Sequence, residues 1–236
     1  MYLATCTRPD IAYVVGQLSR YVQSPTQQHI GAAKRVLRYL IGTKSLGIVY
    51  STEVNAKPAD TLVIDGFCDS DWGNDPDTRK SVTGFVHCMA GGAISWASKR
   101  QTIVAQSTAE AEYVAACEAC MEGQGLRNVL IEVFSQMATR FQLGIDNQAA
   151  FVMATNPTYS RRTRHIELRW HYVRDLVTKK MVTLWKVKTD DNPSDVMTKP
   201  LASDRFEMLN GMIGMNKEHL PKTLTSEEGV LETALE

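Results

Sequence analysis

Four acidic residues, far apart in the chain, each stand where an extended apolar run ends or a helical pattern begins. They are Asp69, Glu112, Asp146 and Asp195. In open α/β folds, strand ends of this kind meet at one edge of the sheet and gather reactive groups there. Carboxylates are hard oxygen ligands that suit Mg²⁺ or Mn²⁺. The pattern therefore predicts an α/β domain whose sheet edge can bind two divalent ions.

Runs of apolar and β-branched residues predict the strands of this domain. We expect them over residues 62–68, 82–89, 93–97, 141–145 and 182–187. Apolar residues at helical spacing predict the helices, over residues 11–22, 30–41, 108–133, 147–154, 165–177 and from 193 onward. The order of three strands, helix, strand, helices, strand and helix indicates a five-stranded mixed sheet flanked by helices.

The same patterns divide the chain into parts. Residues 1–50 are expected to form a two-helix module, which is too small to stand alone, and residues 51–60 a linker. Residues 60–205 are expected to form the main α/β domain. Residues 206–236 are predicted to be an acidic, flexible tail, since little periodicity is left beyond about Lys217.

Charge and cysteine content narrow the class of protein. Basic and acidic residues number 26 each, but residues 201–236 hold seven of the acids and three of the bases, so the rest of the chain carries a net charge of +4. A modest excess of basic residues over residues 1–200 is compatible with phosphate binding.

Five cysteines without a disulfide-framework spacing favour an intracellular, reduced protein, and Cys117 and Cys120 are expected to be buried thiols rather than zinc ligands. No apolar run reaches the roughly 20 residues that span a bilayer, so no membrane partner is expected.

Six short motifs follow one another along the chain. They are Gly66-Phe67-Cys68-Asp69-Ser70-Asp71-Trp72-Gly73 with Asp77-x-Arg79-Lys80-Ser81-Val82-Thr83-Gly84-Phe85, Ile94-Ser95-Trp96-x-Ser98-Lys99-Arg100-Gln101, Ser107-Thr108-Ala109-Glu110-Ala111-Glu112-Tyr113, Asp146-Asn147-Gln148-Ala149-Ala150, Arg164-His165-Ile166-Glu167 with His171, and Asp195-Val196-Met197-Thr198-Lys199-Pro200-Leu201. In this order they resemble the ribonuclease H segment of copia-type retrotransposon polyproteins. Upstream, Thr7-Arg8-Pro9-Asp10-Ile11-Ala12 and residues 33–40 resemble the end of the preceding reverse transcriptase, and the resemblance covers roughly residues 2–215.

The resemblance implies a ribonuclease H-like fold and metal-dependent, endonucleolytic hydrolysis of the RNA strand of RNA–DNA hybrids. It makes Asp69, Glu112, Asp146 and Asp195 both catalytic residues and ligands of two Mg²⁺ ions, for which Mn²⁺ can substitute. Ser107, Thr108, Arg164 and His165 are the candidate substrate contacts. The implied partners are the hybrid and the rest of a polyprotein, in the cytoplasm within a retroelement particle or in the nucleus. DNA synthesis is not expected from this chain.

Several alternatives stay open at this point. Asp71 is a weaker candidate than Asp69, and helical periodicity alone does not choose between Glu110 and Glu112. Asp146 and Asp195, taken singly, are typical of residues that cap a helix start. The loop at residues 188–192 lacks the histidine that many ribonucleases H carry there. The rival function is therefore a catalytically inactive retroelement remnant that only binds nucleic acid or serves a structural role.

Overall fold

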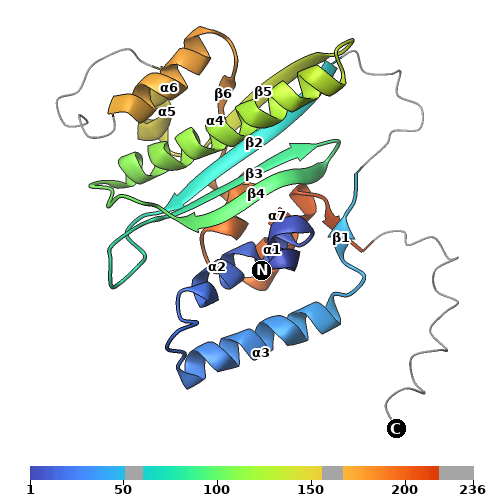
Figure 1. The fold of residues 1–236 in the computed structure, drawn as a ribbon, viewed down its shortest axis with the longest axis vertical. Helices are drawn as coiled ribbons and strands as arrows, with labels where there is room; N and C mark the ends of the chain where they lie inside the picture. Colours follow the sequence, from blue (N-terminus) through green and yellow to red (C-terminus); the bar gives the residue numbers. More distant parts are fainter. Residues whose placement is uncertain (51–60, 156–166, 218–236) are drawn as a thin grey trace, which may run out of the picture.

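A five-stranded mixed sheet forms the centre of the computed structural model, which describes residues 1–50, 61–155 and 167–217. Its spatial order is β4-β3-β2-β5-β6. The strands are β2 (Thr61–Asp71), β3 (Val82–Met89), β4 (Gly92–Arg100), β5 (Ala138–Ile145) and β6 (Thr183–Lys186). The first three pair antiparallel, whereas β2, β5 and β6 run parallel (Figure 1). The predicted mixed sheet is thereby confirmed.

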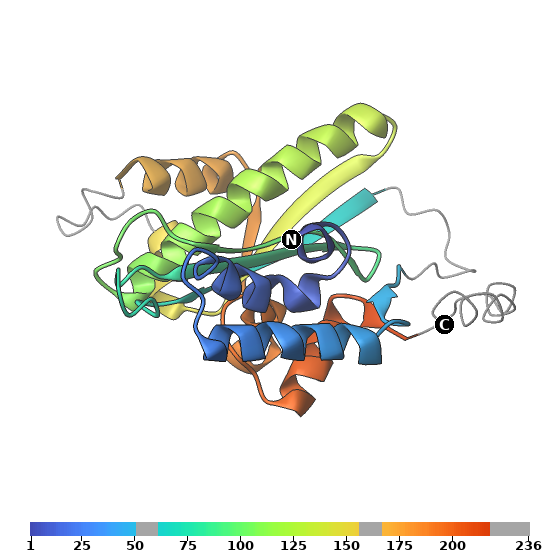
Figure 2. The ribbon, with the colours of Figure 1, turned by 60° about the horizontal axis from the view of Figure 1, so that its bottom comes forward.

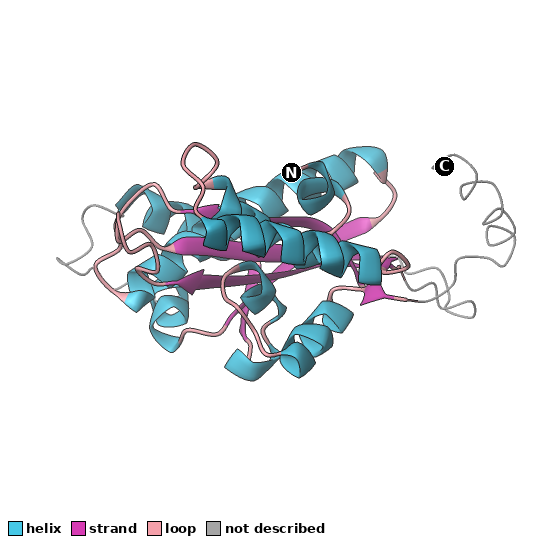
Figure 3. Cartoon of the chain, turned by 90° about the horizontal axis from the view of Figure 1, so that it is seen from below, coloured by secondary structure: helices cyan, strands magenta, loops and turns pink. Residues whose placement is uncertain are grey.

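Helices cover both faces of this sheet, as Figure 3 shows. One face packs against α4 (Thr108–Val133), α5 (Gln148–Thr155) and α6 (Glu167–Thr178). The opposite side carries α1 (Tyr2–Cys6), α2 (Ala12–Ser19), α3 (Gln27–Gly42) and α7 (Ser203–Met212), together with the 3₁₀ turns η1 (Pro9–Ile11), η3 (Thr189–Asp191) and η4 (Pro193–Met197). Figure 2 shows the blue N-terminal helices and the red C-terminal helix on the side opposite the green α4.

The long helix α4 lies close to the sheet because its inner face is built from small residues. Ala111, Ala115 and Ala119 are fully buried there. Further along the same helix, a Cβ atom added to Gly123 would overlap the ring of Phe141 on β5. The close approach fixes the start of α4 beside the ends of β2 and β5, which is where the candidate site lies.

The N-terminal helices pack onto the edge of the sheet. The Trp96 indole on β4 donates a hydrogen bond of 2.7 Å to the carbonyl oxygen of Ala4, and Ile11 is buried. At Gly16 of α2 a Cβ atom would lie 3.2 Å from the backbone oxygen of Ser98. The two helices expected within residues 1–50 correspond to α2 and α3. The linker expected at residues 51–60 lies outside the described residues.

The C-terminal segment differs from the expected flexible tail of residues 206–236. Residues 203–212 form α7, and β7 (Met215–Asn216) pairs antiparallel with β1 (Gly47–Ile48). Leu209, Ile213 and Met215 are buried in a second core beneath the sheet. Their burial explains why this part of the expected tail is ordered. Residues 218–236 lie outside the described part of the chain. Among the described helices, none combines the length and apolar character needed to cross a membrane.

Candidate active site

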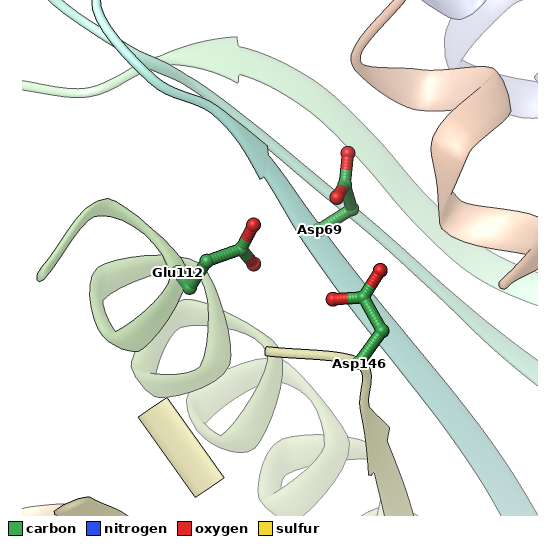
Figure 4. Close-up of side chains that lie close together, drawn as sticks. All are labelled: Asp69, Glu112 and Asp146. Atoms are coloured by element: carbon green, nitrogen blue, oxygen red, sulfur yellow. The ribbon is translucent and has the colours of Figure 1, made fainter. Parts of the chain in front are cut away.

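The register of the central strands brings two of the predicted acids together. Cys68 of β2 pairs with Ile145 of β5 in the parallel ladder, so Asp69 and Asp146 follow directly at the same sheet edge. Glu112 reaches this edge from the second turn of α4. One carboxylate oxygen from each of Asp69, Glu112 and Asp146 can be chosen so that all three lie within 4.8 Å of one another. Figure 4 shows the three carboxylates turned toward a shared space.

Burial makes this cluster of negative charge energetically costly. The side chains of Asp69 and Glu112 are buried, and Asp146 is half-buried. Burial raises the pKa of Asp69, and the nearby Asp195 carboxylate raises it further. Burial also raises the pKa of Glu112 well above its ordinary value, with Asp69 and Asp146 adding to the effect. The pKa of Asp146 is raised by the same causes, burial first and then Asp69. Such a cluster needs positive charge to hold it together.

The donor set fits a hard divalent cation. The Oε2 atom of Glu112 is buried and has no hydrogen-bond partner among the described residues. A buried, unpartnered carboxylate oxygen is expensive unless a ligand satisfies it. Three carboxylates facing one space offer the all-oxygen surroundings that Mg²⁺ and Mn²⁺ prefer. Asp69, Glu112 and Asp146 are therefore the residues that would hold the ion.

Local hydrogen bonds distinguish the candidates that the sequence left open. The Glu110 carboxylate accepts a hydrogen bond of 2.8 Å from the backbone N–H of Gln106, at the start of α4. Asp71 accepts a hydrogen bond from the side-chain amide of Asn74 in the turn after β2. Neither residue belongs to the three-carboxylate cluster. The geometry favours Glu112 over Glu110 and Asp69 over Asp71.

The residue that caps the start of α5 is Asn147 and not Asp146. The Asn147 side-chain oxygen accepts a hydrogen bond of 3.0 Å from the backbone N–H of Ala150 in the first turn of α5. Asp146 is thus left to face the cluster. Asn192 plays the same part for η4, because its Oδ1 accepts hydrogen bonds from the backbone N–H and the hydroxyl of Ser194. The carboxylate of Asp195 is therefore also free of a capping role.

Asp195 lies beside the cluster but with different partners. It is buried in η4, and its Oδ2 lies 2.7 Å from Nη2 of Arg205. Its Oδ1 lies 2.9 Å from Nζ of Lys199. The same ammonium lies 3.3 Å from Oδ1 and 3.3 Å from Oδ2 of Asp69. Burial alone would lower the pKa of Lys199, but the two aspartates raise it above its ordinary value.

A glycine on β3 allows η4 to reach the site. Gly84 pairs with Asp69 across the antiparallel ladder. A Cβ atom at this position would lie 2.5 Å from Cγ2 of Thr198 and 2.7 Å from Cβ of Met197. The absence of a side chain lets the Thr198 hydroxyl donate a hydrogen bond to Asp69. The amide of Asn192 adds a hydrogen bond of 3.0 Å to the carbonyl oxygen of Cys68.

Lys199 and Arg205 were not predicted from the sequence to be site residues. Lys199 stands four residues after Asp195, a spacing that places opposite charges side by side, so a charge-pair signal was available. Arg205 had none, because it lies at the start of α7, next to the segment expected to be a flexible tail. Its guanidinium also donates a hydrogen bond of 2.9 Å to the carbonyl oxygen of Thr189, in the loop that lacks the expected histidine.

Of the four candidate substrate contacts, Ser107 and Thr108 are among the described residues. Ser107 is the N-cap of α4, where its hydroxyl accepts a hydrogen bond of 3.2 Å from the backbone N–H of Glu110. Thr108 begins the helix, and both residues are exposed beside the cluster. Arg164 and His165 lie outside the described residues, so their predicted roles stay predictions.

Comparison with known proteins shows that the chain is similar to one part of much longer polyproteins. It is 38% identical over 216 residues to the retrovirus-related Pol polyprotein from transposon TNT 1-94 of Nicotiana tabacum, which covers 92% of this chain and 16% of that protein. It is 34% identical over 216 residues to the corresponding polyprotein from transposon RE1 of Arabidopsis thaliana, covering 92% of this chain and 14% of that protein. The chain thus spans about one sixth of these relatives or less.

Among solved structures, the RNase H1 crystal structure from the halophilic archaeon Halobacterium salinarum NRC-1 aligns with a TM-score of 0.43 at 16% identity, covering 58% of this chain and 94% of that one. No family model matches the sequence. The sequence relatives carry the assignment, because they match 92% of the chain at 34–38% identity. The chain belongs to the family of copia-type, retrovirus-related Pol polyproteins.

Proposed function

We propose that this segment is a metal-dependent endonuclease that hydrolyses the RNA strand of RNA–DNA hybrids. The observation that carries the proposal is the inward-facing cluster of Asp69, Glu112 and Asp146, with its unpartnered Glu112 oxygen. The family membership supports it, since the resemblance to the ribonuclease H segment of such polyproteins implies this activity. Mg²⁺, or Mn²⁺ in its place, is the proposed cofactor.

The proposed chemistry assigns simple roles to the protein groups. Divalent ions in such sites make bound water nucleophilic and stabilise charge on the leaving oxygen. Asp69, Glu112 and Asp146 would hold the divalent ion at the sheet edge, and Thr198 orients the Asp69 carboxylate through its hydrogen bond. No protein nucleophile is required. Hydrolysis in this way leaves a 5′ phosphate and a 3′ hydroxyl.

Substrate recognition is proposed to depend on duplex shape. RNA–DNA hybrids are distinguished by the RNA 2′-hydroxyls and by backbone geometry rather than by base sequence. Ser107 and Thr108, exposed at the start of α4, are proposed contacts of the sugar–phosphate backbone. Arg164 and His165 are proposed to bind phosphates. The proposed protein partner is the rest of a polyprotein. The proposed location is an intracellular retroelement particle or the nucleus.

A cleavage assay tests this function. Purified protein is incubated with an end-labelled RNA–DNA hybrid, with matched RNA–RNA and DNA–DNA duplexes as controls, in Mg²⁺ and in chelator. We expect cleavage of the RNA strand of the hybrid alone, and only with the metal. Hybrid binding without cleavage by folded protein would instead support the inactive remnant. Glu112→Gln serves as the variant that removes a proposed ligand without changing its shape.

A further inference from the structure

A buried glutamine links the start of α4 to the central sheet. Gln101 directly follows the last residue of β4, and only 2% of it is exposed. Its Nε2 donates a hydrogen bond of 2.9 Å to the carbonyl oxygen of Ala111, near the start of α4. The same nitrogen lies 3.1 Å from Oγ1 of Thr83 on β3 and 3.4 Å from Oγ of Ser70 on β2. One side chain therefore bonds to the helix and to two strands.

The partners of Gln101 are the chain neighbours of two carboxylates of the cluster. Ala111 directly precedes Glu112, and Ser70 directly follows Asp69. Burial raises the pKa of Glu112, and a hydrogen bond from the backbone of Ser70 opposes this shift. The Glu112 carboxylate thus reaches from α4 toward the strand that Gln101 also contacts (Figure 4). The position of α4 relative to β2 sets the separation of the Glu112 and Asp69 carboxylates.

The segment that carries Gln101 is itself held in place on both sides. Nη1 of Arg100 lies 2.7 Å from Oδ2 of Asp75. The indole of Trp72 donates a hydrogen bond of 3.0 Å to the carbonyl oxygen of Ala105. Both contacts fix the connection between β4 and α4 against the turn that follows β2. The Gln101 side chain therefore starts from a defined position.

Stability alone does not account for a glutamine at this place. Its Oε1 is buried and has no hydrogen-bond partner among the described residues. A buried carbonyl oxygen without a partner costs free energy, whereas an apolar side chain of similar length would not carry this cost. The hydrogen bonds of Nε2 are directed instead at α4 and β2, the elements that carry Glu112 and Asp69.

We propose that Gln101 is a positioning residue for the carboxylate cluster: its amide fixes the start of α4 against β2 and so sets the separation of Glu112 and Asp69 that suits a divalent cation. The proposal rests on the proposed metal-dependent function and adds a residue to it. Metal sites tolerate only small errors in the positions of their ligands. Removal of a group that orients a ligand commonly weakens metal binding by about 10–100-fold.

The metal affinity of the folded protein tests the proposal without turnover. Gln101→Met keeps the length of the side chain but removes its N–H donors. We expect its Kd for Mn²⁺, measured by isothermal titration calorimetry, to rise by about tenfold or more. Circular dichroism in chelator confirms that the titrated protein is folded, and Glu112→Gln identifies the binding that belongs to the cluster. A merely structural glutamine would change the unfolding midpoint and leave the Mn²⁺ affinity of the folded protein unchanged.

Gln124→Met is the matched control. Gln124 is a second buried glutamine whose Oε1 has no partner among the described residues. Its Nε2 donates a hydrogen bond of 2.7 Å to Oδ1 of Asn128 on the same helix. Gln124 lies about three helical turns beyond Glu112. We expect this variant to bind Mn²⁺ as the wild type does.

Thr83→Val provides a second variant at the proposed link. It removes one acceptor of the Gln101 amide with little change of side-chain volume. It should weaken Mn²⁺ binding, but by less than Gln101→Met does. Wild-type affinity in both folded variants would overturn the proposal, as would wild-type affinity in Thr83→Val alone if Gln101→Met does not fold.

Cleavage of the hybrid at varied Mg²⁺ concentration gives a second readout. For Gln101→Met, the Mg²⁺ concentration of half-maximal rate should rise by the same factor as the Kd for Mn²⁺, with an unchanged KM for the hybrid. A wild type that binds Mn²⁺ and cleaves, with Gln101→Met equal to it in both, would overturn the inference and leave the proposed function intact. If the wild type binds Mn²⁺ without cleaving, the proposed function fails and the Mn²⁺ affinities decide the inference. A wild type that binds no Mn²⁺ would overturn both.

Discussion

At the scale of single residues, hydrogen bonding separates the acids of the site from their look-alikes. Glu110 bonds to the backbone of Gln106, whereas Oε2 of Glu112 has no partner among the described residues. Glu112→Gln should therefore lower hybrid cleavage more than about 100-fold, because it removes a metal-binding charge. Glu110→Gln should retain most activity and lose about 1 kcal/mol of stability or less, as expected for a weakened helix start. Parallel rates and melting curves check both, and the reverse ranking would contradict the assignment of Glu112.

His87 gives a pH-dependent prediction that does not involve the site. It is buried on β3, where Nε2 lies 3.1 Å from the carbonyl oxygen of Ala119 and Nδ1 has no partner among the described residues. Burial lowers its pKa from 6.5 to about 4, although the bond to Ala119 opposes the shift. The unfolded chain therefore takes up a proton at higher pH than the folded one. Its contribution to stability is complete above pH 6.5 and is lost as the pH falls toward about 4.

The loss amounts to about 3 kcal/mol over this window. Denaturant unfolding between pH 4 and 7 measures it, with His87→Gln as the comparison. The glutamine keeps an N–H donor for Ala119 but cannot titrate, so the variant should show a smaller fall in stability over the same window. Identical pH profiles for the two proteins would show that His87 is not the titrating group.

Part of the site was predictable from the sequence because it depends on short-range pattern. Asp69 and Asp146 stand at the ends of apolar runs, and parallel pairing of those runs brings them together. The choice of Glu112 over Glu110 required the family resemblance, since helical periodicity did not decide it. The partners of Asp195 depended on tertiary packing: Arg205 comes from α7, whose order rests on the burial of Leu209 and Ile213.

At the scale of elements, two glycines of α4 offer a matched pair of variants. A Cβ atom at Gly123 would enter the ring of Phe141, whereas one at Gly125 meets nothing within 4 Å. Gly123→Ala should destabilise the protein by about 1–3 kcal/mol through overpacking. Gly125→Ala should stabilise it by about 0.5–1 kcal/mol, because alanine is the better helix former. Chemical denaturation of both variants checks the signs, and equal effects would mean that α4 does not approach β5 as closely as described.

Element positions followed from the sequence better than element ends did. All five strands of the sheet were expected, but β2 continues to Asp71 and β4 to Arg100, beyond their apolar runs. Ladder pairing with β3 extends both strands, and ladder pairing is not visible in one strand's own residues. The predicted last helix at residue 193 is instead the short 3₁₀ turn η4, followed by α7. Pro200 separates the two.

At the scale of the whole molecule, the carboxylate cluster destabilises the folded protein but creates a site that can bind a cation. Asp69, Glu112 and Asp146 hold like charges close together in a buried place, which the fold must tolerate when no cation is bound. A cation that binds only the folded state stabilises it by mass action, by about 2.7 kcal/mol at one hundred times its Kd. The melting temperature of the wild type should therefore rise with Mg²⁺ concentration.

Glu112→Gln should stabilise the metal-free protein and weaken its response to Mg²⁺. In chelator, the neutral amide removes one buried charge without changing shape, so the variant should melt above the wild type by about 2–4 °C, which corresponds to about 1 kcal/mol in a chain of this size. Its melting temperature should also respond much less to Mg²⁺, because a ligand is missing. Asp69→Asn should gain less in chelator, since it gives up the ion pair with Lys199. Scanning calorimetry of the wild type, Glu112→Gln and Asp69→Asn at several Mg²⁺ concentrations measures these melting temperatures. A Glu112→Gln variant that melts below the wild type in chelator, yet gains as much from Mg²⁺, would show that Glu112 is a structural residue and that the metal binds elsewhere.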